Sequence, residues 1–256
     1  MDSHQMRQKS KNIKEDKKTR RHIEKYGWSV IMIEATDYLP SFAYSIGLWE
    51  KFNHPEIISF GLSLKTLHAI INDAGRLVKS GLIIETRRDY DDFFENGKSQ
   101  FISIIPNYVT NYFGYAIDFY NTRDFPALQL TWTDRNNKFP WEPDFEEEFK
   151  YRQPLLDRNV DFKFREEKNL GVFTTRQFLE ENKPILRVVH DGDGDWQFLT
   201  GDQIVDDARL VSLQEMTLRD ITLNEVFNLD YGQAADRNLI GDFWRRSNIE
   251  IENESE

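Results

Sequence analysis

The sequence of 256 residues contains no cysteine, which excludes disulfide bonds and thiolate metal ligands. It also lacks any apolar run that approaches the ~20 residues needed to cross a bilayer as a helix. Its first residues are polar and rich in Lys and Arg, without the apolar core of a signal peptide. We therefore expect a cytoplasmic protein.

Motifs for cofactors and catalysis are missing as well. No G-x-G-x-x-G or Walker sequence occurs, and the five histidines do not have the spacing of a metal site. Ser45 is followed by Gly47 two residues later, but Ala43 stands where a nucleophile elbow has its first glycine. The sequence thus predicts no cofactor and leaves open whether the protein is an enzyme.

The charge of the chain is unevenly distributed. The net charge is −11, although residues 1–25 contain nine Lys or Arg against four Asp or Glu. This local charge of +5 leaves −16 on the remaining chain, which disfavours binding to nucleic acid phosphates. An acidic surface suits a basic protein partner, because opposite charges speed the encounter. Solubility alone would also explain it.

Apolar spacing predicts alternating strands and helices in the first part of the chain. We expect strands at 28–34, 42–48, 57–60, 82–86, 100–105 and 127–133, and helices at 14–25, 63–80 and 108–120. Ser63 is placed to cap the second helix, and Gly27 and Gly81 are placed to end the first two. This pattern is typical of an α+β fold with a mixed sheet and packed helices.

A change of composition over residues 134–166 predicts a domain boundary, followed by a smaller α+β domain. We expect a disordered basic N-terminus at 1–13, a first domain at 14–150, a linker at 151–180, a second domain at 181–246 and an acidic tail at 247–256. In the second domain, the turn-forming string DGDGD between residues 185–190 and 195–199 predicts a β-hairpin. A strand is expected at 208–213, and weaker helical patterns cover 224–229 and 234–244.

The DGDGD string also has partial calcium-loop spacing. Asp191, Asp193 and Asp195 occupy the first, third and fifth positions of such a loop, and Asp202 falls at the twelfth. However, Trp196 stands at the sixth position, where the sharp bend needs glycine, and the twelfth residue is not the required Glu. A hairpin turn is therefore favoured over a metal site.

The stretch Phe42–Leu62, FAYSIGLWEKFNHPEIISFGL, combines two strand-like runs with an aromatic-rich bend and the triplet His54-Pro55-Glu56. Together with YGWSV at 26–30 and LQLTWTD at 128–134, it resembles the signature of a bacterial domain of unknown function, family 4262. The resemblance extends over roughly residues 20–150 and implies no established activity.

The C-terminal part has a weaker resemblance to small bacterial immunity-protein-like domains. The segments involved are DWQFLTGD at 195–202 and FWRR at 243–246. Such a resemblance implies a protein that binds and neutralises another protein.

The His54-Pro55-Glu56 triplet is the best candidate for a site. An imidazole that titrates near neutral pH and an adjacent carboxylate would suit acid–base chemistry. Pro55 instead indicates a fixed turn before the third strand, in which both side chains bond to backbone groups. We favour this structural interpretation.

Aromatic residues and charges from the signature segments extend this candidate pocket or interface. The complete set is Tyr44, Trp49, His54, Glu56, Trp132, Asp134 and Trp141. Such a group is as typical of a binding hot spot as of a ligand pocket, and an ordinary aromatic core is the interpretation that we favour.

We favour a protein-binding module, such as an immunity protein that neutralises a basic toxin, without nucleic acid or membrane binding. The alternative is a hydrolase or transferase of unknown substrate that uses a pocket at His54 and Glu56.

Overall fold

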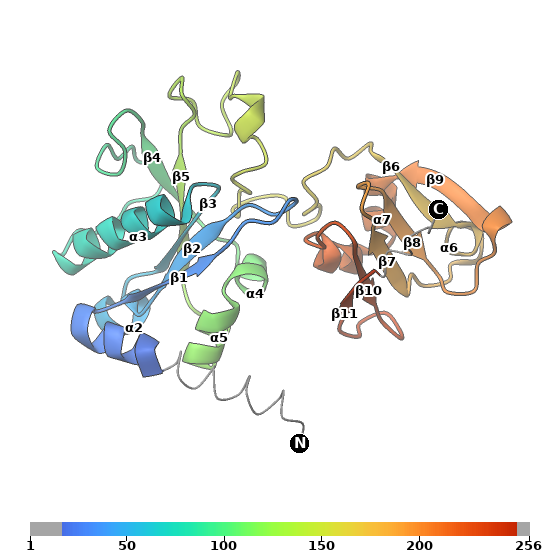
Figure 1. The fold of residues 1–256 in the computed structure, drawn as a ribbon, viewed down its shortest axis with the longest axis horizontal. Coiled ribbons are helices and arrows are strands. Elements are labelled where there is room, and N and C mark those ends of the chain that lie inside the picture. The colour runs from blue at the N-terminus through green and yellow to red at the C-terminus, as the bar shows by residue number, and fades with distance from the viewer. Residues whose placement is uncertain (1–16, 250–256) are drawn as a thin grey trace, which may run out of the picture. The chain divides into compact units, whose positions relative to one another are not determined.

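The computed structural model describes residues 17–249, and these residues divide into two compact units (Figure 1). The first unit runs to Ala35 and from Pro40 to Arg158, and the second comprises Thr36–Leu39 and the chain from Asn159 onward. Each unit contains helices and a mixed sheet, which confirms the predicted α+β class. The predictions for residues 1–13 and for most of the acidic tail lie outside the described residues.

The first unit is built on a five-stranded sheet in the order β1-β2-β3-β5-β4. The strands are β1 (Ser29–Ile33), β2 (Phe42–Ile46), β3 (Glu56–Phe60), β4 (Ser99–Ser103) and β5 (Ala127–Trp132). β3 and β5 run parallel, and every other neighbouring pair is antiparallel. β1 therefore forms one edge of the sheet and β4 the other.

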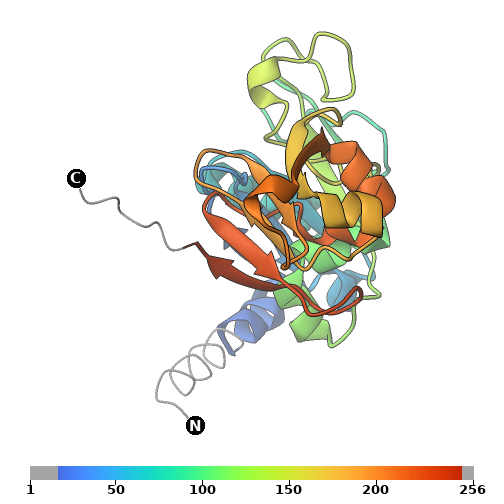
Figure 2. The same cartoon turned by 90° about the vertical axis from the view of Figure 1, so that its right-hand side faces the viewer.

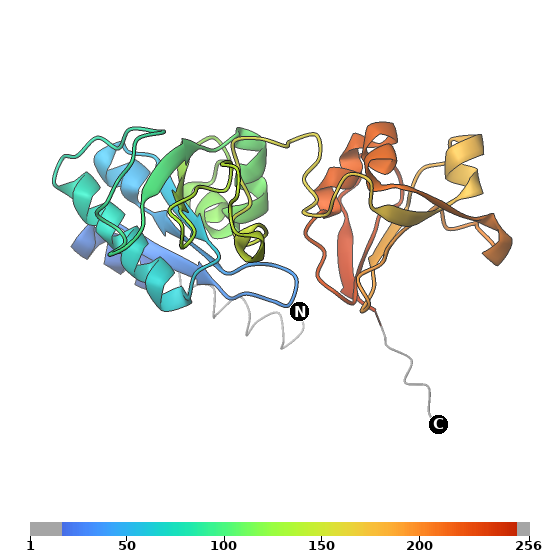
Figure 3. The same ribbon diagram turned by 90° about the horizontal axis from the view of Figure 1, so that it is seen from above.

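Helices cover both faces of this sheet (Figure 3). Successive side chains of a strand point to opposite faces. Ala43 belongs to the apolar cluster under α3 (Leu64–Lys79), whereas the ring of Tyr44 lies 5.0 Å from that of Phe113, beside α4 (Val109–Tyr112) and α5 (Gly114–Tyr120). Burial from both sides explains why the central strands read as continuous apolar runs.

α3 forms as its sequence predicts. The Ser63 hydroxyl accepts a hydrogen bond from the backbone N–H of Thr66 and so caps the first turn. Gly75 lies where Trp28 packs against the helix, and a Cβ at this position would lie 2.4 Å from Cε2 of Trp28. The absence of a side chain at Gly75 therefore lets the indole approach the helix backbone.

Two predicted elements of the first unit differ in the structure, and one element was not predicted. Residues 17–26 are helical and end at Gly27, as expected, but residues 82–86 form no strand and contribute an isolated bridge from Thr86 to Phe101. The helix expected at 108–120 is divided into η1 (Pro106–Tyr108), α4 and α5, with the backbone of Phe113 outside helical geometry between α4 and α5. A short helix, α2 (Leu48–Phe52), follows β2 and was not predicted.

The second unit, drawn in yellow to red in Figure 2, contains a six-stranded sheet in the order β11-β10-β7-β8-β6-β9. The strands are β6 (Gly171–Thr175), β7 (Arg187–His190), β8 (Trp196–Leu199), β9 (Ala208–Ser212), β10 (Gln233–Asp236) and β11 (Arg245–Asn248). Trp196 and Phe198 of β8 are almost fully buried, and the ring centroid of Trp196 lies 4.0 Å from that of His190 and 5.0 Å from that of Phe164. The unit also contains α7 (Leu213–Arg219) and η4 (Ile221–Val226).

The predicted β7–β8 hairpin is confirmed, with His190 opposite Trp196. The helix expected at 234–244 is wrong, because residues 233–236 and 245–248 pair as β10 and β11. The stretch predicted as a linker, 151–180, ends in β6 and the start of α6 (Arg176–Glu181), and β6 lies inside the sheet between β8 and β9. Val172 and Phe178 of this stretch are buried, and β6 pairs with strands more than 20 residues further along the chain, which local composition does not reveal.

Candidate functional site

The Glu56 carboxylate is the centre of a buried polar network in the first unit. Its side chain is completely buried at the start of β3. Oε1 accepts hydrogen bonds from the backbone N–H of Gly47 (2.9 Å) and Trp49 (3.0 Å) and from the hydroxyl of Tyr120. Oε2 accepts from the Ser45 hydroxyl at 2.5 Å. The carboxylate thus binds the first amides of α2 and performs the role of a helix cap.

Gly47 is required by this arrangement. Its φ of 113° lies in the left-handed region, and it turns the chain from β2 directly into α2. A Cβ on Gly47 would lie 2.8 Å from the carbonyl oxygen of Gly27. The short turn brings the amides of Gly47 and Trp49 to the Glu56 carboxylate.

Burial raises the pKa of Glu56 above its ordinary range, although the surrounding hydroxyl and amide donors favour the charged form. The pKa of Tyr120 is also raised, by its own burial and by the nearby Glu56 charge. Both carboxylate oxygens already accept hydrogen bonds, and the side chain has no exposed surface. This geometry stabilises the β2–α2 turn and gives a substrate no access to the carboxylate.

His54 does not join the network. Its Nδ1 donates to the carbonyl oxygen of Pro55 at 2.7 Å, and its half-buried ring has a lowered pKa because burial disfavours the charged form. The backbone N–H of His54, which follows α2, donates to the carbonyl oxygen of Leu48, the first residue of that helix. These contacts are the backbone bonds expected of a structural histidine.

The remaining predicted residues lie elsewhere. Trp132 donates to the Phe60 carbonyl at 2.8 Å, and Trp141 stacks on Phe139 with ring centroids 4.8 Å apart. Asp134 organises the loop after β5, where its carboxylate accepts from the backbone N–H of Asn136, Lys138 and Glu146.

The predicted set therefore does not form one pocket. Glu56 is opposite Ala127, the first residue of β5, whereas Trp132 is the last residue of that strand. Trp49 does contact the network, since its ring lies 5.1 Å from that of Tyr120. From β2, the sequence interpretation chose Tyr44 and missed the adjacent Ser45, which is a partner of Glu56. It also missed the second hydroxyl partner, Tyr120. The only sequence signal for Ser45 was a small polar residue inside an apolar strand.

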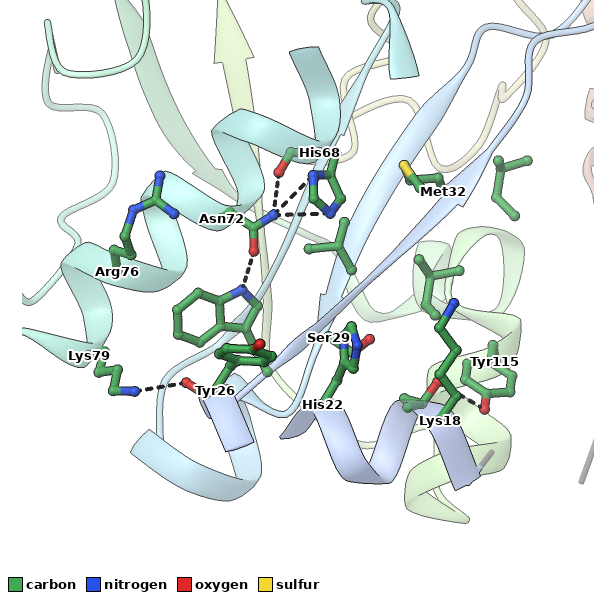
Figure 4. A pocket seen from close by; sticks show the side chains of 15 residues that line it. Lys18, His22, Tyr26, Ser29, Met32, His68, Asn72, Arg76, Lys79 and Tyr115 are labelled. Carbon is green, nitrogen blue, oxygen red and sulfur yellow. Dashed lines mark hydrogen bonds between the residues drawn. The ribbon is translucent and has the colours of Figure 1, made fainter. Parts of the chain in front are cut away.

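A second feature, which the sequence analysis did not identify, is a groove along β1 (Figure 4). It has a volume of about 1040 Å³ and follows all five residues of the strand. Residues 17–26 and α5 supply one wall, and α3 supplies the other. The lining residues are Lys18, Thr19, His22, Tyr26, Trp28, Ser29, Val30, Ile31, Met32, Ile33, His68, Asn72, Arg76, Lys79 and Tyr115.

The walls of the groove combine basic and apolar groups. Lys18, Arg76 and Lys79 contribute cations, and no Asp or Glu is among the described residues that line it. Lys79 donates to the Tyr26 carbonyl at 3.0 Å, and Arg76 also pairs with Asp73 outside the lining. Between the two walls, the floor of the groove is formed by β1, whose residues are uncharged and mostly apolar.

The Asp-rich string of the second unit forms a turn, as predicted. Asp191 accepts hydrogen bonds from the backbone N–H of Asp193 (3.1 Å) and Asp195 (2.9 Å), so it closes the β7–β8 hairpin. Among the described residues, no three His, Asp or Glu side chains gather in a way that could hold a metal ion. None of the described helices is both long and apolar enough to span a membrane.

Comparison with known families identifies the first unit. Residues 22–146 match the family described as Domain of unknown function (DUF4262). This confirms the resemblance stated from the signature segments. The match contains both the Glu56 network and nearly all of the β1 groove, whereas the immunity-protein resemblance of the C-terminal part remains a prediction. No curated protein and no solved structure matches the chain.

Proposed function

We propose that this protein is a bacterial, cytoplasmic protein-binding module whose DUF4262 domain contacts its partner through the groove along β1. The observation that supports this most is a sheet edge that has no partner strand within residues 17–249 and lies in an open groove of about 1040 Å³. Apolar surface bordered by a few charged groups is typical of protein interfaces.

The alternative, a hydrolase or transferase that uses His54 and Glu56, has less support. A general base must come within hydrogen-bond reach of the substrate proton. The Glu56 carboxylate has no exposed surface and four donors, and the His54 Nδ1 is occupied by the Pro55 carbonyl. Neither group is presented to a common pocket.

Toxin neutralisation by an immunity protein is the form of binding that we propose for this module. The acidic chain favours a partner that is basic overall, because net charge governs the long-range encounter. The segment of the partner that enters the groove meets the positive charges of its lining instead.

Site-specific photo-crosslinking in the native host tests the proposal. A photoreactive amino acid replaces Met32, which lines the groove and is 45 % exposed, and in a control it replaces Ile83, which is 79 % exposed on the same unit and outside the groove. We expect one discrete protein adduct from position 32, none from position 83, and loss of the adduct when Arg76→Glu is added. Equal labelling from both positions would contradict the proposal.

A further inference from the structure

The free edge of β1 is unprotected compared with other sheet edges. Among the described strands, β1 pairs with β2 alone, so every second residue of β1 directs its N–H and C=O groups away from the sheet. Proteins usually shield such edges with Lys, Pro or a bulge. β1 reads SVIMI and has none of these, and Met32 and Ile33 are 45 % and 40 % exposed.

The edge of the other sheet gives an internal contrast. β11 reads RRSN, and all four of its residues are exposed. Two adjacent arginines on an edge strand are a common protection against pairing with other chains. β9, at the opposite edge of that sheet, reads ARLVS and also contains an arginine, so β1 differs from both of these edge strands in having no charged residue.

The charges beside β1 specify what can pair with it. Cations stand on both walls, with Lys18 on residues 17–26 and Arg76 and Lys79 on α3. Lys17 and Arg21 extend the positive surface at one end of the groove. A segment seated between these walls would gain from carboxylates and would be repelled if it carried Lys or Arg.

We propose that the groove binds an extended, acidic segment of a partner protein, which adds to the sheet as a sixth strand beside β1. Strand addition of this kind obtains its affinity from main-chain hydrogen bonds and its specificity from side-chain contacts. Alternate side chains of the segment would face the two walls. The inference rests on the proposed function and specifies the chemistry of the partner at the same site.

A fluorescent peptide tests this inference with the full-length protein. The probe is an octapeptide of alternating Glu and Thr, and the matched peptides replace Glu by Gln or by Lys. Fluorescence anisotropy should show saturable binding of the Glu peptide and binding at least ~10-fold weaker for the other two. Raising the salt concentration should weaken binding, because the charge contacts are partly exposed.

Charge reversal on α3 locates the binding. Arg76→Glu should weaken binding of the Glu peptide ~10-fold, whereas Lys65→Glu, on the same helix but outside the groove lining, should leave it nearly unchanged. Thermal melts establish that both variants are folded. Equal affinity for the Glu and Gln peptides, or equal effects of the two variants, would overturn the inference.

The chain's own acidic C-terminal end is the main rival occupant. Its glutamates are Glu250, Glu252, Glu254 and Glu256. If the wild type fails to bind the Glu peptide and a variant with these four residues changed to Gln binds it, this segment already fills the groove and the partner proposal is overturned. A partner crosslinked from position 32 through a neutral or basic segment would overturn the inference alone and leave the proposed function standing.

Discussion

The Ser45 hydroxyl and the Glu56 carboxylate lie 2.5 Å apart in the interior of the first unit, on neighbouring strands. Ser45 also accepts a hydrogen bond from the backbone N–H of Ile57 at 2.9 Å, so its donor and acceptor capacities are both used. This pair joins β2 and β3 at the point where the chain turns into α2. The buried Ser45–Glu56 pair therefore ties the two strands together beside the start of α2.

Replacing the central carboxylate should destabilise the fold. In Glu56→Gln, the amide NH₂ group would face donors in place of an acceptor, and at least one buried hydrogen bond would be lost. We expect the free energy of unfolding to fall by about 1–3 kcal/mol, the cost of leaving a buried hydrogen-bonding group without its partner. Urea denaturation measures this loss, and Glu50→Gln, at an exposed neighbour, is the control. A wild-type midpoint for Glu56→Gln would contradict a structural role.

The same carboxylate should make stability depend on pH. Because burial raises the folded-state pKa of Glu56, the folded protein binds the proton more tightly than the unfolded chain does. This contribution is fully present below the unfolded pKa of about 4.3 and is lost as the pH rises through the higher folded value. The difference in unfolding free energy between wild type and Glu56→Gln should therefore shrink as the pH rises. If the difference in unfolding free energy instead grew as the pH rises, the hydrogen-bond donors around Glu56 would outweigh its burial and lower its folded-state pKa.

His54→Ala should reduce the free energy of unfolding by ~1–3 kcal/mol, because the hydrogen bond to the Pro55 carbonyl is removed. Burial lowers the folded pKa of His54, so its contribution is present above the unfolded pKa of about 6.5 and declines as the pH falls through the folded value. Thermal melts at several pH values measure both effects. A variant that melts like the wild type would count against the structural interpretation.

Gly75→Ala should also destabilise the first unit, because the new methyl group would collide with the Trp28 indole, 2.4 Å away. Overpacking of this kind costs about 1–3 kcal/mol. Gly114→Ala is the matched control, since a Cβ there meets nothing within 4 Å. Chemical denaturation of both variants should show a clear loss for the first and little change for the second. Equal stability of the two would contradict the close packing of Trp28 on α3.

Limited trypsin digestion tests the division of the chain. The sequence alone predicts cleavage within 150–182, and the structure narrows this range, because residues 171–181 form β6 and α6. We expect early cleavage after Arg158, where the first unit ends and the second begins. Cleavage first at Arg176, inside the folded second unit, would contradict the boundary.

Local patterns were sufficient for much of the first unit. The apolar stripe of α3 with its Ser63 cap and the β-branched run of β1 predict their elements because the signal lies within a few neighbouring residues. β10 was predicted as a helix, because the Ala-rich stretch at 234–235 favours helices and its pairing with β7 depends on residues about 45 positions away. Local propensity cannot report such long-range pairing.

The candidate site was harder to predict than the fold. The sequence identified Glu56 but paired it with adjacent His54, whereas its actual partners include Tyr120, 64 residues further on. The β1 groove was missed altogether. Its lining comes from residues 17–26, β1, α3 and α5, and it exists because β1 is at the edge of the sheet. Edge position is a property of strand order, which the sequence analysis left undetermined.

Hydrogen–deuterium exchange of the β1 amides is the most direct test of the central claim that this edge is a binding surface. The full-length protein is measured alone and with a saturating amount of the alternating Glu-Thr octapeptide. Strand addition should slow exchange at alternate residues of Ser29–Ile33, where the outward N–H groups gain partners, and should leave the β4 edge unchanged. Unchanged exchange in β1 while the peptide is bound would contradict the account.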